Sequence, residues 1–360
     1  MIEIKRLSAL DSLRGIAAIG VAFFWHYQHF KPEGGYPFSH IGYWFYHFGW
    51  NLVDFFFVLS GFIFTYVYKQ KISERKLLFQ EFSVLRLSRL YPLHIVTLLV
   101  VAIIQFIRYI SIHNFYIYQY NDVYHLILNL LFIQHGWFEL GFSFNAPTWS
   151  ISSEVVAYIL FFFIIYYSKY YKLFFIAMIF LGLTIYHAKL NSPFFNEGIA
   201  RVLIGFFIGC LTCDFNNYLG ELIKKYLVLI GIGVIIILSV IASIFYGHKV
   251  LGDWALVYTI MYYPIIIILL LNIGLLRGIL SLKPFAYIGE VSYSIYLWHF
   301  PLQLMVNTLD NILELHINYS SKKVFIGFVL LTLIVSIISF EFFEKPFSKF
   351  LRRRFIPTKT

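Results

Sequence analysis

Long apolar segments follow one another along the whole chain, and they restrict the fold more than any other feature. A helix needs about 20 mainly apolar residues to cross the hydrocarbon core of a bilayer. With only 13% charged residues, the 360-residue chain has too few charges to cover a soluble domain of its size. The sequence therefore predicts an all-α, polytopic integral membrane protein with about ten transmembrane helices. The expected spans are 9–30, 42–68, 91–112, 149–167, 173–187, 199–214, 226–246, 254–272, 287–308 and 324–343.

The distribution of basic residues predicts how these spans are oriented. Lys and Arg accumulate in the cytoplasmic loops of membrane proteins, and most of the 28 in this chain fall on one side if both termini are cytoplasmic. Topology then explains the net charge of +10, so we expect a lipid bilayer and not nucleic acid as the partner. Residues 1–347 form the expected transmembrane domain, residues 348–360 a short basic cytoplasmic tail, and no soluble domain is expected.

Ionisable residues inside apolar segments are costly to bury, which makes them candidates for function. In the first segment Asp11 and Arg14 are spaced i,i+3, so they can pair on one helix face or anchor the helix at the interface. His26 lies about 18 Å further along the helix axis. At that depth it is either functional or a buried, hydrogen-bonded core histidine.

Further polar residues lie at or inside the other expected spans, and each has a structural alternative. Arg86 and Arg89, expected in a loop entering the third span, can bind phosphates or simply mark the cytoplasmic side. Glu154 is either a buried carboxylate with a partner or a residue of a helix cap. The remaining candidates are Asp54 in the second span, Trp149 and Ser150 before Glu154, Arg201 opening the sixth span, and Tyr296 and His299 in the ninth.

Taken together and in order, these residues resemble the acyltransferase-3 family of membrane-bound acyltransferases. The resemblance covers about residues 8–347, and its strength lies in the combination because each motif alone is weakly specific. The motifs are Leu10–Ala18 with His26, the Phe-Phe-Phe-Val-Leu-Ser-Gly-Phe run at 55–62, Arg86-x-x-Arg89-x-x-Pro92, Thr148-Trp149-Ser150-Ile151-Ser152-x-Glu154, Ser292–Leu297 with His299 and Pro301, and Glu344-Lys345-Pro346.

The resemblance implies an acyl-CoA donor, usually acetyl-CoA, and transfer to a sugar hydroxyl of a bacterial surface polysaccharide or lipid-linked glycan. A multi-pass protein of the bacterial cytoplasmic (inner) membrane is therefore expected, with no metal. On chemical grounds His26 would remove the hydroxyl proton or transiently accept the acyl group, with its ring oriented by Glu154 or Asp54. Arg14, Arg86 and Arg89 would bind CoA, and Asp11, Asp54, Trp149, Ser150, Arg201, Tyr296 and His299 would support the site.

One spacing departs from the family pattern. Ten residues normally separate the arginine from the histidine, whereas eleven separate Arg14 from His26. In a regular α-helix the extra residue rotates His26 to about 120° from Arg14. Either a π-bulge absorbs the residue, or the two side chains serve different faces, in which case His29 is another candidate.

Two other classes of protein remain as alternatives. A flippase or transporter for polysaccharide units would show internal repeat symmetry and paired broken helices, which the sequence lacks. A non-catalytic membrane scaffold would not need His and Arg inside its first span. The sequence does not identify the acceptor sugar, the length of the acyl group or the oligomeric state.

Overall fold

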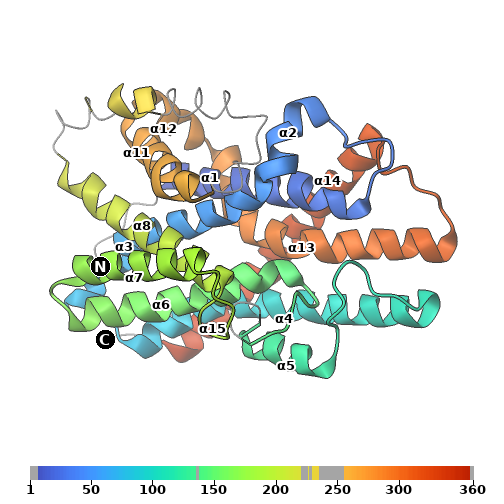
Figure 1. Cartoon of the computed structure of the whole chain (residues 1–360), viewed down its shortest axis with the longest axis horizontal. Coiled ribbons are helices and arrows are strands. Elements are labelled where there is room, and N and C mark those ends of the chain that lie inside the picture. Colours follow the sequence, from blue (N-terminus) through green and yellow to red (C-terminus); the bar gives the residue numbers. More distant parts are fainter. Residues whose placement is uncertain (1–6, 135–137, 220–225, 227–228, 235–254, 357–360) are drawn as a thin grey trace.

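The computed structural model describes residues 7–134, 138–219, 226, 229–234 and 255–356. Within these ranges every regular element is helical, which confirms the all-α prediction. The long helices run roughly along the horizontal axis of Figure 1, with the short α5 below α4 in this view. The elements are α1 Ser8–Ile19, η1 Gly20–Trp25, η2 His26–Phe30, α2 Ser39–Phe48, η3 Gly49–Asn51, α3 Leu52–Ser73, α4 Phe79–Ile112, α5 Val123–Leu131, η4 Ala146–Thr148, α6 Trp149–Tyr167, α7 Tyr171–His187, α8 Glu197–Tyr218, α10 Ala255–Val257, η6 Tyr258–Tyr262, α11 Tyr263–Asn272, α12 Gly274–Leu280, α13 Lys283–Leu313, α14 Lys322–Ser339, η7 Phe340–Glu344 and α15 Lys345–Phe355.

Six helical stretches in the described ranges are long and apolar enough to cross a membrane. A seventh candidate combines Tyr258–Asn272 with Gly274–Leu280, which meet at a 94° bend. The expected span at 173–187 is the shorter apolar helix α7, the one at 287–308 lies in the more polar α13, and 226–246 falls largely outside the described residues. The protein is thus a multi-pass helical bundle, while ten spans and cytoplasmic termini stay predictions.

The stretch from Arg86 to Pro92 is helical, contrary to the expected loop. Helix α4 begins at Phe79 because the Glu81 carboxylate accepts a hydrogen bond from the Leu78 backbone N–H, 3.0 Å away, and satisfies the first turn. Pro92 lies inside α4, where it removes one backbone hydrogen bond without ending the helix. Arg86 and Arg89 are therefore fixed on a helix, one turn apart.

Glycines allow two pairs of helices to pack with their backbones in close contact. Where α3 meets α8, a methyl group at Gly61 would overlap the Phe206 carbonyl, and one at Gly209 would overlap the Val58 carbonyl. Where α1 meets α13, a methyl group at Gly289 would overlap the Asp11 carbonyl. Small residues at such crossings are typical of helix packing in membranes. The two crossings bring the polar residues of α1, α3, α8 and α13 together.

The C-terminal helix is part of the bundle. Helix α15 packs along α4, and Arg352 Nε donates a hydrogen bond of 3.1 Å to Ser88 Oγ. The boundary expected at residue 347 lies within this helix. Leu7 and Arg352 line the same cavity, so the two ends of the described chain meet at one end of the bundle.

Candidate active site

A π-helix separates Arg14 from His26. Helix α1 changes to π-helix at Gly20–Trp25, and His26 opens the 3-10 turn η2 that follows. A π-helical turn takes up one more residue than an α-helical turn, and such segments are frequent at functional sites. The extra residue in the Arg14–His26 spacing is absorbed in this way, which confirms the first of the two alternatives.

His26 forms a hydrogen-bonded pair with His299 of α13. The His26 Nδ1 and His299 Nε2 atoms are 2.7 Å apart, and the two rings are nearly coplanar, with an interplanar angle of 5°. The ring of His29 stacks on His26 with a centroid distance of 5.1 Å. Gln303, one turn after His299, donates a 2.8 Å hydrogen bond to the His26 carbonyl. The ring of His26 is therefore held by α13, not by Glu154 or Asp54 as expected.

A cavity of about 240 Å³ between α1, α3, α4, α6 and α13 brings the three expected CoA-binding arginines together. Arg14, Arg86 and Arg89 all line it, as do Glu154 and Tyr296. We call this cavity the inner chamber. Its walls are otherwise mostly aromatic and aliphatic, so the charged groups face one another in a poorly solvated space where electrostatic interactions are strong.

Glu154 is the carboxylate of the inner chamber. It accepts hydrogen bonds from Ser60 and Tyr158 and is attracted by Arg14 and Arg86. Arg86 donates to the Tyr68 hydroxyl, and its guanidinium lies 4.7 Å from the centroid of the Phe64 ring. Among the described residues, Arg86 Nε is buried without a hydrogen-bond partner. The chamber thus keeps donor capacity that the protein itself does not use.

Tyr296 closes the inner chamber toward the histidines. Its hydroxyl donates to the Pro147 carbonyl, 2.8 Å away, and lies 3.1 Å from Ser150 Oγ. Asn145 Nδ2 donates to the Leu297 carbonyl at 3.1 Å, so the segment before α6 is fixed to α13 at two consecutive residues, Tyr296 and Leu297. The Tyr296 ring centroid is 5.7 Å from that of His299. His299 therefore links the chamber wall to His26.

Asp54 and Arg201 form a buried ion pair away from His26. The Arg201 Nε and Asp54 Oδ1 atoms are 2.8 Å apart, and both side chains are largely buried. The guanidinium also lies between two indole rings, 5.2 Å from Trp50 and 5.1 Å from Trp149. Asp54 therefore neutralises Arg201 and ties α3 to α8, which positions Trp149 at the start of α6.

A second cavity, of about 460 Å³, opens beside the inner chamber, and we call it the vestibule. Asp11, Glu290 and Glu344 line it, together with Arg89 and basic residues of α15. Ile63, Val67 and Arg89 line both cavities. The vestibule and the inner chamber are therefore adjacent, with Arg89 at their junction.

A third cavity, of about 680 Å³, lies at the N-terminal ends of α6 and α8, and we call it the outer cavity. Its lining combines Trp149, Tyr186 and Phe142 with polar groups, among them Asn191 and Arg201. Trp149 lines this cavity, whereas the next residue, Ser150, lines the inner chamber. The first turn of α6 therefore separates the two.

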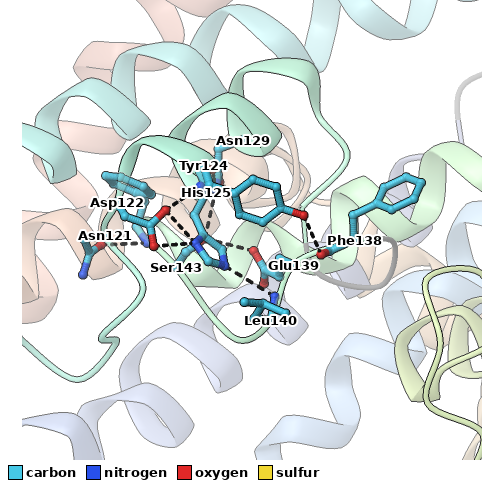
Figure 2. Close-up of polar contacts among 10 residues, drawn as sticks. Asn121, Asp122, Tyr124, His125, Asn129, Phe138, Glu139, Leu140 and Ser143 are labelled. Atoms are coloured by element: carbon cyan, nitrogen blue, oxygen red, sulfur yellow. Dashed lines mark hydrogen bonds and ion pairs between the residues drawn. The ribbon is translucent and has the colours of Figure 1, made fainter.

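A polar cluster orders the loop that carries Phe142. Figure 2 shows the His125 ring between Asp122 and the Leu140 backbone: Nδ1 is 2.9 Å from the carboxylate, and Nε2 accepts from the Leu140 N–H at 3.4 Å. Ser143 bridges Glu139 and Asn129 at 2.9 and 3.0 Å. These contacts fix residues 138–144 against α5 and hence the wall of the outer cavity.

Several residues of the site were not among the sequence candidates. Tyr158 and Ser60 hold Glu154, Gln303 holds the backbone of His26, and Arg352 reaches the vestibule. Tyr158 was detectable in principle, because it lies four residues after Glu154 on one helix face. The charge of Arg352 was visible, but it belongs to a basic run that topology alone explained.

A multi-pass bundle in which an arginine-lined chamber lies beside the half-buried His26 and the buried His299 is suited to moving an acyl group from a charged donor, and the comparisons with known proteins define this class. The class is that of multi-pass membrane proteins with an acyltransferase domain. A family model described as an acyltransferase domain matches residues 7–341, and the chain belongs to this acyltransferase-3 family.

The sequence identity to individual relatives is low. The chain is 26% identical to O-acetyltransferase OatA of Staphylococcus aureus (strain NCTC 8325 / PS 47), covering 99% of this chain and 60% of the relative. It is equally similar, at 26% identity over 96% of its length and 58% of the relative, to a putative O-acetyltransferase of Staphylococcus aureus (strain COL). The chain thus spans about 60% of the length of these curated relatives. No solved structure matches.

Proposed function

We propose that this protein is an O-acetyltransferase of the bacterial cytoplasmic membrane that moves an acetyl group from acetyl-CoA to a sugar hydroxyl of a surface polysaccharide or lipid-linked glycan. One observation carries the proposal: a hydrogen-bonded histidine pair, His26 and His299, lies next to a chamber lined by three arginines. The family and the names of the relatives support acyl transfer, and the choice of donor and acceptor is our inference.

The histidine pair supplies a base of defined orientation. If His26 Nδ1 carries the proton and donates it to His299 Nε2, the lone pair on His26 Nε2 is free to accept a proton. The acceptor hydroxyl transfers its proton to this nitrogen as its oxygen attacks the thioester carbon. The new C–O bond replaces the C–S bond, and the CoA thiolate takes the proton back from the imidazolium.

The three arginines of the inner chamber are suited to binding a CoA donor. CoA carries several phosphate charges, and arginine binds phosphate through two parallel hydrogen bonds. Arg14, Arg86 and Arg89 line one chamber, whose far wall, Tyr296, lies against His299. A donor held by the arginines would extend its thioester toward the histidines, with Glu154 limiting the net charge of the chamber.

The outer cavity is suited to the acceptor. Sugar rings present apolar C–H faces and several hydroxyls, and the lining offers Trp149 and Tyr186 for the faces and Asn191 for the hydroxyls. The cavity volume of about 680 Å³ falls within the range of small-molecule sites. We assign this cavity to the entering glycan, on the other side of the first turn of α6 from the donor.

Purified protein in lipid nanodiscs tests the proposal directly. With acetyl-CoA and a glycan extract from the source membrane, we expect release of the CoA thiol that depends on the acceptor and a mass increase of one acetyl group on the glycan. His26→Ala, present at normal levels, should lose both signals. A protein that moves glycan between leaflets without consuming thioester would instead be a flippase, and the proposal would be wrong.

A further inference from the structure

The C-terminal helix α15 contributes basic side chains to the vestibule. Lys345, Lys349 and Arg352 line it together with Arg89 of α4. Lys345 is 3.1 Å from the Glu341 carboxylate and is thereby neutralised. Arg352 and Lys349 form no such ion pair with the described residues, although Lys349 attracts Glu341 at longer range, so α15 directs two cations to this cavity that no described carboxylate contacts directly.

Arg352 is held against α4, near both Arg86 and Arg89. Its Nε donates to Ser88 Oγ, 3.1 Å away, and Ser88 lies between Arg86 and Arg89 in the sequence. Both of these arginines repel Arg352 electrostatically. Bringing three guanidinium groups together is unfavourable unless an anion shares them. The hydrogen bond to Ser88 thus holds Arg352 in a place that suits a polyanion.

The three carboxylates of the vestibule come from α1, η7 and α13, and Glu344 is attracted by Arg89. Glu344 accepts a 2.6 Å hydrogen bond from Ser294 of α13. Asp11 belongs to α1 and Glu290 to α13. The α15–α4 wall is therefore the basic side of the vestibule, and it leads through Arg89 into the inner chamber.

We propose that Arg352 and Lys349 of α15 bind the phosphates at the nucleotide end of acyl-CoA, so that the C-terminal helix completes the donor site. The inference rests on the proposed function, because it takes CoA as the donor. Phosphate chemistry could also be offered by an anionic lipid headgroup. We favour CoA because Arg89 makes the vestibule continuous with the chamber that holds the other two arginines.

The test measures binding and not catalysis. Full-length protein is titrated with CoA in nanodiscs of purely zwitterionic lipid and, separately, in nanodiscs that contain anionic lipid. Pantetheine, which lacks phosphates, competes in a parallel experiment. Arg352→Gln keeps a donor for Ser88, and Lys349→Gln changes an exposed residue. We expect each substitution to weaken CoA binding about tenfold and to leave the affinity for pantetheine unchanged. Arg353→Gln, on the same helix but exposed and absent from the cavity lining, is the matched control and should bind CoA like the unsubstituted protein.

Three results would overturn the inference. Both variants binding CoA like the unsubstituted protein would show that α15 does not contact the donor. Equal weakening of CoA and pantetheine would show a structural effect. A defect confined to nanodiscs with anionic lipid would assign the cations to a headgroup. If the unsubstituted protein itself does not bind CoA, the proposed function fails first, and this result is distinct from the other three.

Discussion

At the scale of single residues, the sharpest prediction separates His26 from His29. His26 is hydrogen bonded to His299, whereas the His29 ring only stacks on the His26 ring. We expect His26→Ala to lower kcat by about 100- to 10,000-fold, the usual range for losing a general base. His29→Ala should lower it by less than about tenfold. Acceptor-dependent thiol release measures both, and a larger loss in His29→Ala would assign the role to the other ring.

His299 is predicted to be a positioning residue. Its only described link to the reaction is through the Nδ1 atom of His26, so removing it should reduce kcat and leave the donor KM unchanged. We expect about a 100-fold loss for His299→Ala, because the ring of His26 is then free to rotate.

The conservative variant is the control for this role. His299→Gln places an amide oxygen near the position of His299 Nε2, where it can accept from His26 Nδ1, and should recover part of the rate. A rise in donor KM in both variants, with kcat unchanged, would place His299 in donor binding instead.

Most of these residues could be identified as candidates from the sequence, but their contact partners could not. Charged and imidazole side chains are rare in apolar segments, so His26, Arg14 and Glu154 were visible as candidates. Their partners are set by helix packing: His299 is 273 positions from His26, and no spacing rule connects them. Asp54 is an example: the sequence marked both Asp54 and Arg201 as candidates, but it did not indicate that the two form an ion pair.

At the scale of elements, the glycine crossings predict which packing contacts the bundle needs. A methyl group at Gly61 would overlap the Phe206 backbone, so Gly61→Ala must push α3 and α8 apart. We expect this to lower the free energy of unfolding by about 1–3 kcal/mol or more. We expect a lower midpoint of thermal unfolding in detergent, measured by fluorescence-detected gel filtration.

Gly327 of α14 is the matched control, because a methyl group there meets open space. Gly327→Ala should leave the midpoint unchanged or raise it slightly, since alanine is the better helix former. Equal destabilisation by both variants would contradict the role of the α3–α8 crossing.

The loop cluster predicts a pH-dependent contribution to stability. Partial burial opposes ionisation of Asp122, but hydrogen bonds from the backbone and ring of His125 outweigh it and lower the pKa of Asp122. Such a carboxylate stabilises the fold above its ordinary pKa of 3.8 and loses this effect as the pH falls through the folded value. The unfolding midpoint of Asp122→Asn should therefore lie below that of the unsubstituted protein between pH 5 and pH 7, by a gap that narrows toward about pH 3.

The matched control is Glu33→Gln, which changes an exposed carboxylate. It should show no such gap at any pH. If the difference in unfolding midpoint between Asp122→Asn and the unsubstituted protein did not change with pH, the charge of Asp122 would not contribute, and the contact would stabilise the loop through packing alone.

Element boundaries were predicted less well than element type. Helical periods and length identify α3 or α14, but α4 begins twelve residues before the apolar run, because a capped polar turn extends it. The same extension turns the Arg86–Arg89 pair from a loop feature into a fixed face of a helix. Likewise, α13 extends beyond the predicted span 287–308 at both ends, because polar residues continue the helix there.

At the scale of the whole molecule, the cavities lie at different depths along one helix. Asp54 near the start of α3 contacts Arg201 of the outer cavity, and Val67 of the same helix lines the vestibule. Thirteen residues of helix correspond to about 20 Å, which is most of a hydrocarbon core. This arrangement separates the proposed donor side, where the two ends of the described chain meet, from the proposed acceptor side.

The positive-inside distribution then predicts which compartment each side faces. Cys210 and Cys213 are buried, so cysteines introduced at exposed positions can be labelled against a low background. Lys189→Cys, at the outer cavity, should react with a membrane-impermeant maleimide in intact cells. Arg353→Cys, on α15, should react only after the membrane is permeabilised. The reverse pattern would place the vestibule outside, where soluble acyl-CoA is absent, and would exclude transfer from a cytoplasmic donor.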